Sequence, residues 1–149
     1  MLEEAVQGAM KEAMKAKDSS RLRGLRAIRS AILNAKTEKG ASSMTEADEI
    51  ALLQKLAKQR RESMAIYQEQ GRDDLLADEK AELEIIESFL PEQMDDATLE
   101  QELQAIIQET GAGSVKDMGR VMGKARERLA GKADNQRMAA KIKAMLGGS

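Results

Sequence analysis

Apolar residues recur three or four positions apart along nearly the whole chain, and no stretch alternates apolar with polar residues. This spacing places side chains on one face of a helix, whereas a half-buried strand requires a period of two. The pattern therefore predicts an all-α fold. Four such faces are predicted in the N-terminal part of the chain, and they consist of Leu2, Val6, Ala9 and Ala13; Leu22, Leu25, Ile28 and Ile32; Ile50, Leu53, Ala57, Met64 and Tyr67; and Leu76, Leu83, Ile86 and Leu90.

Capping residues and breaks separate these predicted helices. Asp18 or Ser19 is placed to cap the second helix, because a short polar side chain there accepts a hydrogen bond from the first helical turn. Gly40 marks the break after the second helix. Thr45, followed three positions later by Asp48, resembles a capping box and indicates the start of the third helix.

The single proline of the chain marks the predicted boundary between two subdomains. Gly71 is the expected C-cap of the third helix, and the fourth stops at Pro91, which lacks the backbone N–H that a continuing helix needs. We predict a four-helix subdomain over residues 1–92 and a three-helix subdomain over residues 93–149. The apolar faces of the last three helices are predicted at Leu99, Leu103, Ile106 and Ile107; Val115, Met118, Met122, Ala125 and Leu129; and Met138, Ile142, Met145 and Leu146.

The chain contains no Cys and no His. This composition excludes disulfides, thiolate metal sites, a Ser-His-Asp arrangement and the usual zinc ligands. There is no Gly-rich phosphate loop, and the acidic run between Asp73 and Glu87 lacks the spacing of a calcium or two-metal loop. We therefore predict no catalytic residue, no cofactor and no metal site, and we expect that the isolated chain is not an enzyme.

The N-terminal segment does not resemble a signal peptide, because it carries Glu3 and Glu4 and has no continuous apolar run. No segment approaches the length of a membrane span. Together with the absence of Cys, these features predict a cytoplasmic protein that does not associate with membranes.

Charge is divided unevenly along the chain. Residues 1–110 hold 15 Lys/Arg and 23 Asp/Glu, whereas residues 111–149 hold 9 and 3, which gives net charges of −8 and +6. A basic tail favours an anionic partner such as RNA. Its sharpest feature is a row of four cations at consecutive i, i+4 positions, here called the basic ridge: Lys116, Arg120, Lys124 and Arg128. Further cations that extend the ridge, if the last helix packs alongside, are Lys132, Arg137, Lys141 and Lys143. The plain alternative is a solvated helix face.

Three glycines accompany the basic ridge. Gly119 and Gly123 lie inside the predicted helix, where each costs about 1 kcal/mol relative to alanine. The interpretation that we prefer is close approach of a neighbouring helix, and the alternative is close approach of a nucleic-acid backbone. Gly131 follows the end of the same apolar pattern and is expected to be a C-cap.

Two further groups of cations lie in the predicted second and third helices. With 23 acids in the same region, we expect that most of these cations pair within the molecule, and the alternative is contact with RNA. The two groups are Arg21, Arg23, Arg26 and Arg29, and Lys55, Lys58, Arg60 and Arg61.

Six segments occur together in an order that is typical of one family. They are residues 58–63 (KQRRES), 71–75 (GRDDL), 81–86 (AELEII), 90–93 (LPEQ), 116–123 (KDMGRVMG) and 131–134 (GKAD). The whole chain resembles the YqeY-like proteins of the GatB/YqeY family. Its tail is similar to the C-terminal tail domain of GatB, a subunit of aspartyl/glutamyl-tRNA amidotransferase.

The resemblance implies two all-helical subdomains and a role with tRNA, because the tail domain in the amidotransferase helps to grip the tRNA body. It also implies the family label of carbon-nitrogen ligase with glutamine as amido-N-donor, although the catalytic parts of the amidotransferase have no counterpart here. The matching motif supplies Gly119, Gly123 and Gly131 as positions that determine backbone shape. It supplies no catalytic residue.

Three functional hypotheses follow, of which the last, an autonomous amidotransferase, would need glutaminase activity from the isolated chain. The first is a stand-alone module that binds tRNA or associates with a tRNA-dependent amidotransferase, and that contacts the sugar-phosphate framework through Lys116, Arg120, Lys124, Arg128, Lys132, Arg137 and Lys141. Tyr67 and Phe89 are the only aromatic residues, so recognition of shape and phosphate is expected rather than base stacking, and no DNA partner is expected. The second is a protein–protein adaptor whose basic tail docks on an acidic partner without binding RNA.

Overall fold

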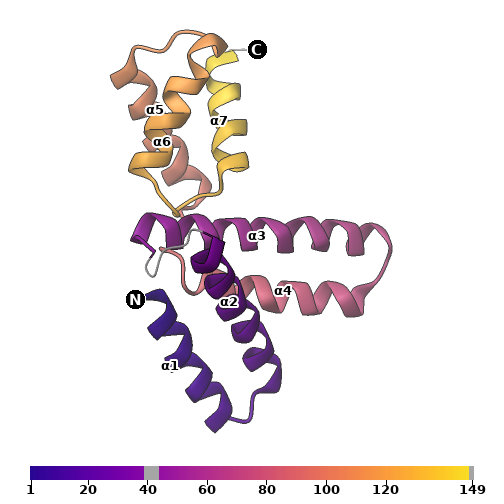
Figure 1. The fold of residues 1–149 in the computed structure, drawn as a ribbon. Coiled ribbons are helices and arrows are strands. Elements are labelled where there is room, and N and C mark those ends of the chain that lie inside the picture. The colour runs from indigo at the N-terminus through magenta and orange to yellow at the C-terminus, as the bar shows by residue number, and fades with distance from the viewer. Residues whose placement is uncertain (39–43, 148–149) are drawn as a thin grey trace. The chain divides into compact units, whose positions relative to one another are not determined.

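The computed structural model describes residues 1–38 and 44–147, and within these residues every regular element is a helix. The all-α prediction is therefore confirmed. The expected break at Gly40 lies outside the described residues. Figure 1 shows the elements in order: α1 (Leu2–Lys15), α2 (Ser19–Glu38), α3 (Glu46–Glu69), α4 (Asp73–Glu87), α5 (Asp96–Thr110), the 3₁₀ helix η1 (Val115–Asp117), α6 (Met118–Arg128) and α7 (Asn135–Gly147).

The chain forms two units, Met1–Leu90 and Pro91–Ser149. The observed division lies two residues before the boundary predicted after residue 92. Each unit has its own apolar core. Because each core is built from residues of a single unit, the N-terminal and C-terminal units are described separately below.

Local hydrogen bonds explain where the helices of the N-terminal unit begin and end. The Asp18 carboxylate accepts a hydrogen bond from the Arg21 N–H at 3.0 Å, so Asp18 caps α2. Thr45 and Asp48 form the expected capping box, with both hydrogen bonds at 3.1 Å. Gly71 follows α3 with φ +68°, a left-handed conformation that glycine adopts without steric cost.

The N-terminal unit consists of two helical hairpins, α1 with α2 and α3 with α4 (Figure 1). Its most buried side chains include Val6, Leu25, Ile28, Ile32 and Leu53, all on predicted apolar faces. α2 also packs against α4 through a glycine that the apolar pattern did not indicate. A Cβ on Gly24 would lie 2.7 Å from Ile85 Cδ1, so the absence of a side chain lets the two helices approach.

The C-terminal unit is a triplet in which α5, α6 and α7 pack on one another. Asp95 caps α5, accepting a hydrogen bond from the Thr98 N–H at 2.7 Å, and Gly111 ends it with φ +68°. One predicted core residue is wrong: Val115 is 46% exposed, whereas Val121 is fully buried. The reason is that Val115 lies in η1, before α6 begins, so it does not share the helical repeat of the residues that follow.

None of the described helices is long and apolar enough to cross a membrane. Within residues 1–38 and 44–147, no group of three or more acidic side chains is arranged to hold a metal ion.

Candidate nucleic-acid interface

The net charge of the C-terminal unit differs from that of the tail alone. The unit begins at Pro91 and therefore includes α5, which contributes acids but no cations. Residues 91–149 hold nine Lys/Arg and nine Asp/Glu, so the unit as a whole is neutral. Any anion-binding property of this unit must therefore come from the local placement of its cations.

Two of the predicted RNA-binding cations join α7 to the start of α5. Arg137 donates hydrogen bonds to Asp96 at 2.7 and 3.1 Å and to the Met94 carbonyl at 2.8 Å. Lys141 lies 2.9 Å from a Glu100 oxygen and 3.4 Å from Asp96. Hydrogen bonds from Arg137 and then Lys141 hold the pKa of Asp96 below its ordinary value, and the bond from Arg137 is the larger cause. The structure therefore engages both cations within the unit.

Arg128, the last residue of the predicted basic ridge, is engaged in the same way. Its Nη2 lies 2.5 Å from Oε2 of Glu109, near the C-terminal end of α5. This hydrogen bond is the main reason that the pKa of Glu109 is lowered and that of Arg128 is raised. Sequence position does not suggest the pair, because the two residues are 19 positions apart.

The remaining ridge residues face solvent. Lys116, Arg120 and Lys124 are exposed, and among the described residues Lys116 and Lys124 have no ion-pair partner. Arg120 lies 3.2 Å from Asp117, whose carboxylate also accepts hydrogen bonds from the N–H groups of Gly113 and Ser114. These backbone bonds, that from Gly113 first, lower the pKa of Asp117. We call Lys116, Arg120 and Lys124 the α6 cation face.

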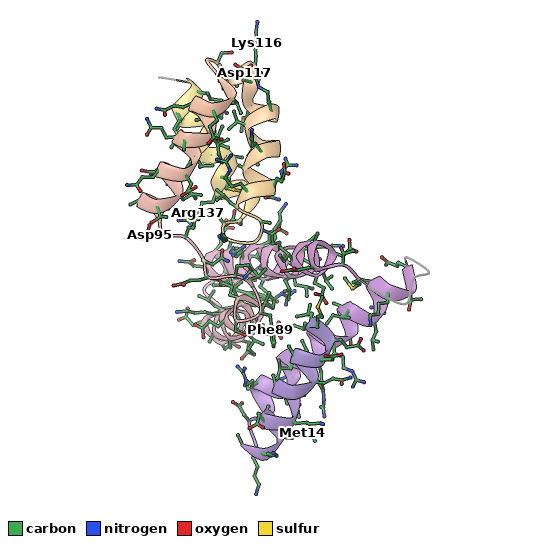
Figure 2. All side chains as sticks on the ribbon, turned by 90° about the vertical axis from the view of Figure 1, so that its left-hand side faces the viewer. Met14, Phe89, Asp95, Lys116, Asp117 and Arg137 are labelled. Carbon is green, nitrogen blue, oxygen red and sulfur yellow. The ribbon has the colours of Figure 1, made fainter. Side chains whose placement is uncertain are left out.

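The predicted ridge and its extension are not one continuous row. Figure 2 shows Lys116 and Asp117 at one end of the C-terminal unit and Arg137 with Asp95 at the other. Lys132 is exposed in the turn between α6 and α7, and it has no ion-pair partner in the described part of the chain. Of the seven predicted binding residues, three have no ion-pair partner in the described residues, namely Lys116, Lys124 and Lys132, and a fourth, Arg120, is exposed but lies beside Asp117.

Within residues 1–38 and 44–147, no neighbouring helix closely approaches Gly119 or Gly123, so the interpretation that we preferred from sequence is wrong. A Cβ at either position would meet nothing within 4 Å. The reason is that α5 and α7 pack against the opposite side of α6, where Val121, Met122 and Ala125 are buried. The two glycines leave bare helix backbone beside the α6 cation face. Gly131 has φ +77° in the turn after α6, but it is not the expected C-cap, because Leu129 holds that position.

Arg126 is an exposed cation on the glycine side of α6 that the sequence interpretation missed. It is exposed, has no ion-pair partner in the described residues, and lies seven positions after Gly119 and three after Gly123. Residues at these spacings share one side of a helix. Plotting the residues around the helix would have placed Arg126 beside the two glycines. The i, i+4 spacing that begins at Lys116 does not include it.

The cations of the N-terminal unit divide into paired and unpaired groups. On α3, Arg60 lies 2.8 Å from Glu79 and 3.0 Å from Glu82, as expected for cations in an acidic region. Burial raises the pKa of Glu79, against the opposing effect of Arg60. The arginines of α2 form no ion pair in the described residues, although the pKa of Glu3 is lowered mainly by Lys36 and also by the charge of Arg29, so the expectation of internal partners holds only as this longer-range interaction. Arg21, Arg23, Arg26 and Arg29 are the four arginines concerned.

The fold and the exposed cations thus define a two-unit, all-helical protein. The family model of the Yqey-like proteins matches residues 3–146. The chain belongs to the YqeY-like family.

Curated relatives carry the name altered inheritance of mitochondria protein 41, mitochondrial. The protein from Pyrenophora tritici-repentis is 27% identical over 146 residues, which cover 95% of this chain and 79% of that protein. Two Saccharomyces cerevisiae relatives, from strains YJM789 and Lalvin EC1118, are each 33% identical over 85 residues, or 57% of this chain. The matched region spans 46% of each yeast protein, so less than half of their length is represented.

Proposed function

We propose that this protein is a stand-alone tRNA-binding module, associated with tRNA-dependent amidotransferase chemistry, that grips the sugar-phosphate framework and does not catalyse by itself. The observation that carries this proposal is the α6 cation face. Its three cations, Lys116, Arg120 and Lys124, project from an exposed surface next to the bare backbone of Gly119 and Gly123.

The distribution of charge supports a specific role for this face. The acids of α5 engage Arg128, Arg137 and Lys141, and they leave Lys116 and Lys124 without a partner among the described residues. Arg120 and Lys124 are like charges at i, i+4 within α6, and such a pair repels by about 0.2 to 0.5 kcal/mol, so it opposes helix formation slightly. A bound phosphate backbone removes this repulsion.

The two glycines favour a nucleic-acid backbone as the ligand. Glycine is often found where another backbone comes close, and here no segment among the described residues occupies that space. A long flexible cation can reach a phosphate from beside such a strip. The resemblance of residues 116–123 and 131–134 to the tail of the GatB subunit supports tRNA as the class of RNA.

The test is a titration of bulk tRNA with the full chain at about 50 and 200 mM salt. We expect the double variant R120E/K124E to bind much more weakly and to reduce the slope of log affinity against log salt by about two, because each lost phosphate contact removes about one. The matched control is K11E/K80E, which makes the same change in net charge at two exposed lysines without ion-pair partners in the described residues.

Unchanged tRNA affinity in R120E/K124E would refute the assignment of the α6 cation face. Equal losses in R120E/K124E and K11E/K80E would indicate a general charge effect and would refute it as well. If the wild-type chain binds no tRNA at low salt, the protein–protein adaptor with an acidic partner becomes the better hypothesis.

A further inference from the structure

A second concentration of cations lies on α2, in the N-terminal unit. From Ser19 to Thr37 this helix contains no acid, and Glu38 is its last residue. Residues 1–90 hold 17 Asp/Glu and 15 Lys/Arg, so acids are abundant in the same unit. Three exposed side chains of α2, which we call the α2 arginine face, form no ion pair among the described residues: Arg23, Arg26 and Arg29. Acids do lie near two of them, because Arg23 lines a hollow together with acids of α4, and the pKa of Glu3 is lowered mainly by Lys36 and also by the charge of Arg29.

The fold explains why these arginines stay exposed. α2 buries Gly24, Leu25, Ile28 and Ile32 against the rest of its unit, and Arg23, Arg26 and Arg29 lie on other sides of the helix. Successive members are three residues apart, which is a rise of about 4.5 Å per step along the helix axis. The face therefore presents three guanidinium groups over about 9 Å of helix. At i, i+3 spacing these like charges disfavour the isolated helix by a few tenths of a kcal/mol per pair.

We propose that the α2 arginine face is a second phosphate-binding surface, which contacts the backbone of the same RNA that the α6 cation face binds. This inference rests on the proposed function. The chain would then hold its RNA through two faces on two units. Once one face is bound, the other meets the RNA at a high effective concentration, so two weak surfaces together give an affinity that neither gives alone.

The chemistry of the face favours RNA over an acidic protein. All three residues are arginine, whose planar guanidinium can donate two parallel hydrogen bonds to a phosphate. A protein interface would be expected to include large apolar or aromatic anchors near its centre. Among the described residues of α2, Leu33 is the one large apolar side chain that is substantially exposed, at 44%. It lies on the arginine side of the helix, four positions after Arg29, but no aromatic or second large apolar side chain of this described helix accompanies it there.

The test compares R23Q/R26Q/R29Q with the wild-type full chain in tRNA titrations across salt. Glutamine is a good helix former, so the substitutions at these exposed positions are expected to preserve helicity, which circular dichroism checks. We expect affinity at low salt to fall about tenfold or more and the salt slope to decrease by about two to three. The matched control is K11Q/K55Q/K80Q, which neutralises three exposed lysines of the same unit.

A second variant, R23K/R26K/R29K, keeps the positive charges but removes the planar guanidinium groups that can each donate two parallel hydrogen bonds to a phosphate. We expect it to retain most of the salt slope and to bind less tightly than the wild type. This variant also keeps the proposal testable if the glutamine variant does not fold.

The outcomes separate the two surfaces. If R23Q/R26Q/R29Q binds tRNA like the wild type while R120E/K124E does not, the α2 proposal is overturned and the proposed function stands. If only the α2 variant loses affinity, the α2 proposal stands and the α6 assignment fails. If the α2 variant and its lysine control lose tRNA affinity equally, the α2 assignment is overturned. It is also overturned if the α2 variant still binds tRNA but no longer binds an acidic protein that the wild type binds.

Discussion

Replacement of Gly123 by alanine tests whether α6 is bare on its outer side. Gly123 lies in the interior of α6, and a Cβ placed there would meet nothing within 4 Å. The substitution therefore adds a methyl group without a clash. Alanine is favoured over glycine in a helix interior by about 0.8 to 1.0 kcal/mol, because glycine loses more conformational freedom on folding.

We expect G123A to stabilise the C-terminal unit by about 1 kcal/mol, which raises the melting temperature of a domain of this size by about 4 to 8 °C. Gly119 is the second residue of α6, so we expect a smaller gain from G119A. Urea and thermal unfolding of the full chain, followed by circular dichroism, provide the measurement.

Gly111 supplies a control of opposite sign. A Cβ at Gly111 also meets nothing within 4 Å, but its φ is +68°. The left-handed conformation costs a residue with a Cβ about 1 to 2 kcal/mol, so G111A should destabilise the unit. The two variants differ in backbone conformation and not in available space, which isolates the cause.

Destabilisation by G123A would refute the reasoning, since it would mean that some segment packs against α6 at this point. The same variant reports on the ligand. If an RNA backbone lies against the glycine strip, G123A should bind tRNA more weakly even though it is more stable. Unchanged affinity would restrict the contact to the flanking cations.

Two further predictions concern acidic groups whose pKa values are shifted in opposite directions. Arg137 lowers the pKa of Asp96, so this pair contributes stability that is fully present above pH 3.8 and is lost as the pH falls through the lowered pKa. In R137A, the free energy of unfolding, measured with urea at a series of pH values, should therefore fall less steeply at acid pH. Burial raises the pKa of Glu79 above 4.5, so the N-terminal unit should gain stability as the pH falls through the raised value. The variant E79Q should lose this gain. If E79Q still gains stability over the same pH range, the assignment to Glu79 is contradicted.

The helices and several of their ends could be predicted from sequence because their causes are local. Thr45 and Asp48 satisfy each other within one turn, and Gly71 adopts its left-handed conformation at the predicted helix end. The register of the α6 face was harder to predict. Residues 115–117 form a 3₁₀ turn, and the change of repeat removes Val115 from the buried face.

The partners of the cations could not be predicted, because they depend on which helices pack together. Arg137 and Asp96 are 41 positions apart, and Arg128 and Glu109 are 19 apart. The net charge calculated from residue 111 onwards also left out α5, whose acids form ion pairs with three cations of the basic tail. The same limitation applies to α2, where the number of acids in the unit suggested ion-pair partners that the packing of the described residues does not supply.

The division between engaged and exposed cations has a consequence for how salt acts on this protein. The ion pairs of Arg128, Arg137 and Lys141 are surface pairs, each worth about 0 to 1 kcal/mol, so screening removes only part of a small contribution to stability. Six phosphate contacts, three from each proposed face, would lose about 10³ in affinity between about 50 and 200 mM salt. Salt should therefore release the RNA while the helices stay folded. Circular dichroism and tRNA binding measured on the same samples separate the two effects, and parallel loss of helicity and binding would contradict this reasoning.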